Sequence, residues 1–254
     1  TLSLHDALPI CIVTLHLAYA PSLEALESLC GTRLPLLMLD TTMDADFGIE
    51  VRADRIMHNH GVHGVMDLAS VLRRSGRAFE IVAGHLSDGR LMDRAAMMVR
   101  ASHAVRCFRG SQILRIGDPF AGMGDFSVPT DVLSKQWGIQ VKQVPLKTLD
   151  DAVKEVSDRL VADETEAVRS HYRCDLPADV HARSVRVGMG LRDLLEQGAY
   201  NGVTVNFQAF DSMDRLANTM PFLEISKAMA RGIGYAGEGD VLTAALVGAL
   251  ARAF

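Results

Sequence analysis

Hydrophobic and polar residues along the chain follow two spacings that predict strands and helices in alternation. Short apolar runs predict strands, whereas apolar residues three or four positions apart predict helices. In the first half, the predicted strands cover residues 11–17, 34–39, 79–83 and 112–116. One predicted helix between them begins at Pro21, and two others cover residues 61–74 and 91–108. This order is typical of a parallel α/β sheet of the Rossmann-like kind.

A glycine-rich segment, residues 117–126 (GDPFAGMGDF), interrupts the pattern. It lacks the G-x-G-x-x-G order of a phosphate-binding loop, so it predicts a loop at a domain junction. Beyond it, helices are predicted at 130–137, 148–169 and 182–195, and strands at 139–144 and 202–207. We therefore expect an N-terminal α/β domain at residues 11–116 and a second α/β domain at residues 117–254.

Both ends of the chain have unusual sequences. Residues 1–10 (TLSLHDALPI) resemble the translation of a common sequencing-library adapter, so we exclude them from the fold prediction. Residues 241–254 form an apolar helical pattern shorter than the roughly 20 residues that span a bilayer, which predicts a buried helix. That pattern has no terminating glycine or asparagine, and we expect the natural protein to continue.

Charge and cysteine content narrow the class of protein. With 26 basic and 31 acidic residues the formal net charge is -5, so we expect neither a nucleic-acid nor a membrane partner. No signal peptide is visible at the N-terminus. The four cysteines form no C-x-x-C pair, and this usage suits a reducing cytoplasm.

Histidines gather at two places in the first half. His58, His60 and His63 fall within six residues, and His85 follows the predicted strand at 79–83. Ligands of parallel sheets bind beyond the carboxyl ends of strands, so these histidines are candidates for a site. The alternatives are an exposed loop with a hydrogen-bonded histidine, or a zinc site using His60 and His63. The H-E-x-x-H motif is absent, which disfavours a zinc hydrolase.

The strongest local signal lies between residues 220 and 243. Pro221 can begin a helix that Gly232 and Gly234 end, and Asp240 can cap the next helix. Glu238 then projects from a Gly-Glu-Gly turn at a helix N-terminus. The helix dipole stabilises an acidic group there, and flanking glycines allow a metal or substrate to approach. Alternatively, Glu238 is only a second acidic residue in a connecting loop.

The string ARGIGYAGEGDVLTAAL resembles a segment of L-arabinose isomerases that reads Gly-Tyr-Gly-Phe-x-x-Glu-Gly-Asp-Trp-Lys-Thr-Ala-Ala-Leu. The resemblance implies that Glu238 binds the catalytic divalent ion, usually manganese, and takes part in proton transfer. Residues 205–207 resemble the Thr-x-Asn-Phe element of the same family, which implies that Phe207 lines the sugar pocket.

Segments in the first half of the chain also resemble the same family, but less closely. His63 with Asp67 resembles the family's Ala-His-Gly-x-x-Glu-Phe stretch, implying that His63 contacts the sugar. Residues 14–21 (TLHLAYAP) resemble the Met-His-Thr-Phe-Ser-Pro strand end, implying that Tyr19 lies near the pocket, and residues 82–85 resemble Val-Val-Gly-His. Asp67 stands in place of glutamate, and residues 241–242 replace Trp-Lys. L-fucose is therefore an alternative substrate to L-arabinose.

The resemblance implies a metal-dependent aldose-ketose isomerase that works through an enediol. It also implies that a second glutamate and two histidine ligands come from a third, C-terminal domain that this sequence lacks. We therefore expect the 254 residues alone to be an inactive fragment, truncated at both ends, that binds manganese poorly. Members of this family form homo-oligomers whose active sites are shared between subunits.

Two other classes of protein remain open. A non-catalytic sugar-binding protein can also consist of two α/β domains with a cleft. A regulatory or structural relative could keep the fold and lack the chemistry. The missing signal peptide and the Glu-Gly-Asp turn disfavour the first of these.

Overall fold

The computed structural model describes residues 8–210, 212 and 214–254. Most of the adapter-like segment, residues 1–7, lies outside the described residues. The chain divides into two compact units, one ending at His103 and the other running from Ala104 to Phe254. The sequence placed this boundary at residue 116, after the strand 112–116. That strand pairs with strands of the second unit, so it belongs to the second sheet.

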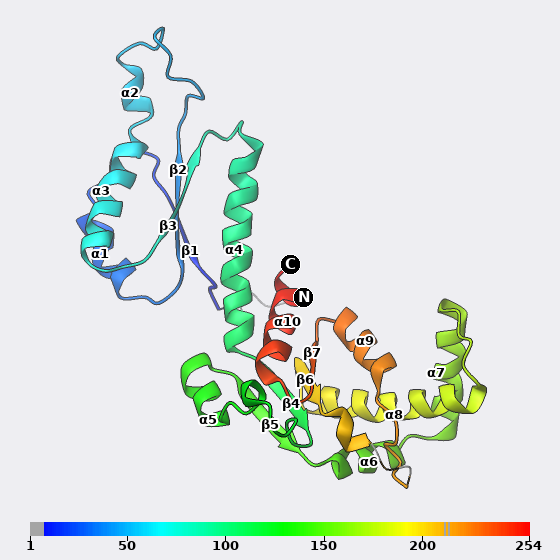
Figure 1. The fold of residues 1–254 in the computed structure, drawn as a ribbon. Coiled ribbons are helices and arrows are strands. Elements are labelled where there is room, and N and C mark those ends of the chain that lie inside the picture. Colours follow the sequence, from blue (N-terminus) through cyan, green and yellow to red (C-terminus); the bar gives the residue numbers. More distant parts are fainter. Residues whose placement is uncertain (1–7, 211, 213) are drawn as a thin grey trace. The chain divides into compact units, whose positions relative to one another are not determined.

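The first unit is a three-stranded parallel sheet covered on both faces (Figure 1). Its strands are β1 (Ile12–Leu15), β2 (Leu36–Thr41) and β3 (Glu80–Gly84), in the order β1-β2-β3. Its helices are α1 (Leu23–Cys30), α2 (Arg55–His58), α3 (Gly61–Arg74) and the larger part of α4 (Gly89–Arg109), up to His103. Leu36 and Met38 of β2 pack with α1 and α3, whereas Leu37 packs with Leu91 and Ala95 of α4.

The second unit is a four-stranded parallel sheet in the order β5-β4-β6-β7. The strands are β4 (Gln112–Ile116), β5 (Gln140–Val144), β6 (Gly202–Val205) and β7 (Gly234–Gly237). The helices are α5 (Thr130–Val132), α6 (Leu146–Lys154), α7 (Asp158–His171), α8 (Ala178–Gln197), α9 (Phe222–Ala230) and α10 (Val241–Ala253). A π-helical turn at Leu133–Trp137 follows α5, and 3₁₀ turns cover Gly124–Phe126 and Phe207–Phe210. Both sheets confirm the predicted parallel α/β class.

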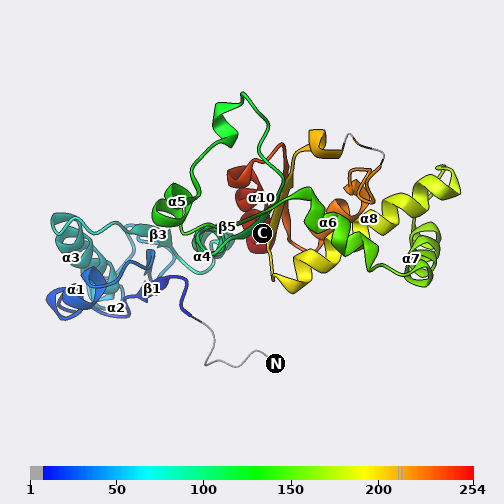
Figure 2. The same ribbon diagram turned by 90° about the horizontal axis from the view of Figure 1, so that it is seen from below.

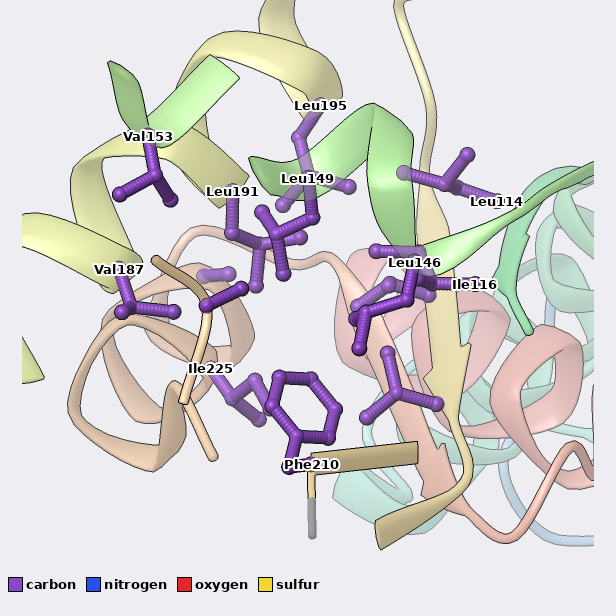
Figure 3. Close-up of a cluster of buried hydrophobic side chains, with 14 residues drawn as sticks. Leu114, Ile116, Leu146, Leu149, Val153, Val187, Leu191, Leu195, Phe210 and Ile225 are labelled. Atoms are coloured by element: carbon purple, nitrogen blue, oxygen red, sulfur yellow. The ribbon is translucent and has the colours of Figure 1, made fainter. Parts of the chain in front are cut away.

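The second sheet has a helix layer on each face (Figure 2). On one face, Leu114 and Ile116 of β4 pack with α6 and α8 in the largest buried cluster (Figure 3). On the other face, Ile113 packs with Val241 and Ala244 of α10. In the described part of the chain, no helix combines the length and apolar character that crossing a bilayer requires.

A partly buried ion-pair network joins α7, α8 and α9. Arg192 donates to Glu164 (2.8 Å) and to Glu224 (2.5 Å), and Arg231 also donates to Glu224 (2.7 Å). Lys227 pairs with Glu164. The Glu224 side chain is only 3% exposed, so these cations supply the compensation that a buried carboxylate requires.

The strand β7 was not predicted from the sequence. Gly234 was assigned to the end of a helix, but α9 ends at Ala230 and Gly234 begins β7. The sequence Gly-Tyr-Ala-Gly has no β-branched residue, so it lacks the usual strand signal. Its conformation depends on pairing with β6, and its glycines admit α10, because a Cβ on Gly234 would lie 1.9 Å from the Ala244 carbonyl oxygen.

Candidate functional site

Glu238 occupies the turn between the carboxyl end of β7 and the start of α10. Its φ of 63° lies in the left-handed region, as does the φ of 93° at Gly239. A Cβ on Gly239 would lie 2.5 Å from the Pro119 Cα, so only glycine fits there. Asp240 caps α10 by accepting from the Thr243 N–H (3.0 Å), as the sequence predicted. A non-glycine residue held in this conformation marks Glu238 as a candidate functional residue.

Hydrogen bonds from two segments, β6 and the loop 117–126, hold this turn in place. The buried Thr204 hydroxyl of β6 accepts from the Gly239 N–H (3.0 Å) and donates to the Gly237 carbonyl (3.3 Å). The Glu238 N–H donates to the last carbonyl of β6 (2.9 Å). The Glu238 carbonyl accepts from the Phe120 N–H (2.8 Å). The backbone on both sides of the Glu238 side chain is therefore fixed.

A cavity of about 450 Å³ opens beside the turn. Aromatic and aliphatic side chains form most of its wall, and Tyr235, Glu238, Asp240 and Thr243 supply its polar groups. The apolar lining residues are Phe126, Val205, Phe207, Met220, Phe222 and Ala236. The Phe207 ring lies 5.8 Å, centroid to centroid, from the ring of Phe120. An apolar wall with a few convergent polar groups is typical of a small-molecule site.

The electrostatics of the cavity involve Tyr235 and Glu238. Burial raises the pKa of the Tyr235 phenol above its ordinary value, and the negative charge of Glu238 raises it further. The phenol is therefore neutral at physiological pH and can both donate and accept a hydrogen bond.

The glycine-rich segment 117–126 forms part of this site, within the second unit. Gln143 of β5 donates to the Asp118 carboxylate (2.7 Å) and to the Gly117 carbonyl (3.2 Å), and it accepts from Arg115 (2.6 Å). Asn206 donates to the Asp118 carbonyl (3.3 Å). Burial lowers the pKa of the Arg115 guanidinium. The domain junction predicted here is thus a loop anchored over the end of the second sheet.

These anchoring residues were missed in the sequence. The available signal was a pair of polar side chains inside two predicted strands, Arg115 and Gln143, which are register partners in β4 and β5. Polar side chains at matched strand positions indicate a hydrogen-bonded pair rather than a core layer.

The other candidate residues lie in the first unit. The ring centroids of Tyr19 and His60 are 5.3 Å apart, and those of His60 and His63 are 4.6 Å apart in an edge-on arrangement. The Nδ1 atoms of His16 and His63 are buried and have no hydrogen-bond partner among the described residues. Asp67 accepts from the Ser22 N–H (3.2 Å), so its carboxylate anchors the start of α1.

Of the remaining candidate histidines, His58 is exposed, whereas His60 and His85 are partly buried. His58 is the last residue of α2, and His60 precedes the first residue of α3. His85 directly follows β3 and lies 2.8 Å from the Ser87 hydroxyl through its Nδ1 atom. This hydrogen bond matches the structural alternative that the sequence left open for His85.

The structure thus groups the candidate residues in two pairs. Glu238 and Phe207 line one cavity in the second unit. Tyr19 and His63 lie in the first unit, where both of their rings contact the ring of His60. Among residues 8–210, 212 and 214–254, no three histidine, cysteine, aspartate or glutamate side chains are grouped closely enough to hold a metal ion.

Comparison with known proteins finds one family. Residues 130–253 match the family model of the L-arabinose isomerase central domain. The chain is 28% identical to the L-arabinose isomerase of Nocardioides sp., over 90% of this chain and 46% of that protein. It is 27% identical to that of Geobacillus thermodenitrificans and 25% identical to that of Bacillus subtilis, in each case over 93% of this chain and 48% of the relative.

The matches extend across both units, and the chain spans about half the length of the curated relatives it matches. The segment that carries the Glu238 turn lies inside the matched central domain. The chain is therefore similar to L-arabinose isomerases over about nine tenths of its length, and its second unit matches their central domain.

Proposed function

We propose that the gene product carrying this chain is an aldose-ketose isomerase that acts on a sugar such as L-arabinose or L-fucose. The observation that carries the proposal is the placement of Glu238 in a left-handed turn beside an aromatic-walled cavity. The relatives, which are named L-arabinose isomerases, support the same reaction.

The reaction requires a group that moves a proton between two neighbouring carbons. A carboxylate takes the proton from C2 of the open-chain aldose and returns it to C1, while a second proton passes from O2 to O1. The enediol then becomes a ketose with no net change in atoms or electrons. Of the two carboxylates at the cavity, Asp240 is engaged as the cap of α10. Glu238 is therefore the candidate acid and base.

The aromatic wall has a separate role in this proposal. Phe207 lines the cavity with half of its surface exposed, and Phe222 lies on the same wall. Such faces pack against the apolar side of a sugar ring or chain and exclude water from the reacting carbons. We propose that Tyr19 and His63 contact the sugar as well, as the family resemblance implies.

The described residues alone do not fit a divalent metal ion. Glu238 is one carboxylate, and a hard divalent ion prefers about six oxygen ligands. We propose that manganese binding by the full gene product depends on ligands outside the described residues. The same reasoning predicts that these 254 residues alone bind manganese poorly and show no turnover.

Two further points follow from the family resemblance. We propose a homo-oligomer in which neighbouring subunits share an active site, and a cytoplasmic location, which the scattered free cysteines support. A small-molecule sugar is the expected partner, and the net charge of -5 supports the exclusion of nucleic acid and anionic membranes.

The test is turnover by the full gene product that carries this chain. L-arabinose, L-fucose and D-galactose are incubated with the protein and manganese, and ketose formation is measured for the wild type and Glu238→Gln. Glu166→Gln is the matched control, because Glu166 is exposed on α7 and does not line the cavity. We expect Glu238→Gln to lose at least about 1,000-fold in kcat, the size of a missing acid-base group in other enzymes.

The outcomes separate the alternatives. Turnover that Glu238→Gln retains would contradict the assignment of Glu238. A folded wild type that binds a sugar and converts none of the three would indicate a binding protein of the same family.

A further inference from the structure

Tyr235 brings a phenol hydroxyl into the cavity beside Glu238. It is the one tyrosine among the described residues that line this cavity. Its hydroxyl lies 3.7 Å from the position that a Cβ on Gly237 would occupy, so the ring runs along β7 toward the carboxyl end of the strand. Gly237 directly precedes Glu238, and the hydroxyl therefore reaches the end of the strand where the candidate acid-base group stands.

The ring of Tyr235 is held, but its hydroxyl is free. The ring packs against the large buried cluster between the sheet and α8. No hydrogen bond joins the hydroxyl to any group in the part of the chain that the structure describes. The hydroxyl lines the cavity, so a ligand can hydrogen-bond it in place of water. The hydroxyl is therefore available to a bound molecule.

The phenol and the Glu238 carboxylate are complementary in hydrogen bonding. An ionised carboxylate only accepts, whereas a neutral phenol both donates and accepts. Together they match two hydroxyl groups on neighbouring carbons, one that donates to Glu238 and one that exchanges a hydrogen bond with Tyr235. The aromatic wall of the same cavity matches the apolar face of a sugar.

The tyrosine at position 235 also differs from the family motif. In the motif Gly-Tyr-Gly-Phe-x-x-Glu-Gly-Asp, the position of Tyr235 is occupied by phenylalanine. This chain therefore has one polar group more in the cavity than that motif provides. A site that hydrogen-bonds a substrate hydroxyl discriminates strongly against an analogue that lacks or misplaces it.

We propose that Tyr235 is a specificity-determining residue, whose hydroxyl hydrogen-bonds a sugar hydroxyl beside the carbons on which Glu238 acts. This inference rests on the proposed isomerase function. Tyr235 orients the sugar and selects among aldoses by the configuration of that hydroxyl.

The test compares two tyrosine variants of the full gene product. Tyr235→Phe removes only the hydroxyl from the cavity. Tyr200→Phe is the matched control, because Tyr200 packs against the same buried cluster and does not line the cavity. Binding of L-arabinitol and L-fucitol, sugar alcohols that cannot isomerise, is measured by calorimetry, and kcat/KM is measured for L-arabinose and L-fucose.

We expect Tyr235→Phe to weaken binding of the preferred sugar alcohol about tenfold and to lower kcat/KM about tenfold, the effect of losing one hydrogen bond. The ratio of kcat/KM between the two aldoses should move toward one, and Tyr200→Phe should stay within about twofold of the wild type. The melting temperatures of both variants should match that of the wild type.

Each other outcome overturns the inference in a recognisable way. An active protein in which Tyr235→Phe changes neither binding nor the ratio of kcat/KM rules out the contact and leaves the isomerase function standing. Equal losses in Tyr235→Phe and Tyr200→Phe indicate a packing effect only. A wild type that neither binds the alditols nor converts an aldose refutes the inference together with the proposed function.

Discussion

Replacing Thr204 by valine should loosen the Glu238 turn without changing the shape of the core. Thr204 is fully buried in β6, and its hydroxyl joins β6 to both glycines that flank Glu238. The Gly237 carbonyl keeps a second donor in the variant, the Asp240 N–H at 3.0 Å. The Gly239 N–H has no other partner in the described part of the chain. Thr204→Val therefore leaves one buried donor unsatisfied.

The magnitude follows from this difference. An unsatisfied buried N–H costs about 2 kcal/mol, whereas the weak 3.3 Å bond to Gly237 adds little. The additional buried methyl group of valine returns at most about 0.8 kcal/mol. We expect a net loss of about 1–2 kcal/mol in the free energy of unfolding, which lowers the melting temperature of a chain of this size by about 4 °C.

The assay is urea unfolding followed by the fluorescence of Trp137, the single tryptophan, which lies in the second unit. Thr165→Val is the matched control, because the buried Thr165 hydroxyl has no hydrogen-bond partner among the described residues. Removing it should be neutral or stabilising. The reasoning fails if the Thr204 variant matches the wild type within about 0.3 kcal/mol, or if both valine variants shift the unfolding midpoint equally.

Two further predictions concern the turn and the partly buried ion-pair network. Gly239→Ala should destabilise the second unit by more than about 2 kcal/mol, because of its φ of 93° and the contact with Pro119, whereas Gly124→Ala in open space should stay within about 0.5 kcal/mol in the same assay. Hydrogen bonds from the cations around Glu164 lower its pKa from 4.5 to about 2. Its contribution to stability is therefore complete above about pH 4.5 and is lost as the pH falls toward 2. Glu164→Gln should reduce the loss in the free energy of unfolding between pH 4.5 and pH 2, measured by unfolding at each pH. An equal loss in the variant and the wild type would contradict the assignment.

Hydrophobic spacing alone was sufficient for one helix that buries a single face and for one strand that is buried on both faces. Residues 61–74 and 112–116 were predicted as a helix and a strand, and α3 and β4 have the same bounds in the structure. The predicted strand at 202–207 is shorter in the structure, because β6 ends at Val205 and Phe207 begins a 3₁₀ turn. Such ends depend on where the neighbouring strands stop pairing, which is not a local property.

Within the candidate site, the sequence by itself determined the residues of the turn. A turn with Glu238 between two glycines, followed by Asp240 as the next helix cap, could be read from the local preferences of glycine for turns and of aspartate for N-caps. Only the tertiary structure decided what surrounds that turn. The Thr204 hydroxyl bonds a backbone group 35 residues away, and segment 117–126, predicted as a domain junction, lies against the same turn. Tyr235 faces the cavity because β7 pairs with β6, and pairing between distant strands is set by sheet register and packing, which no local pattern of residues encodes.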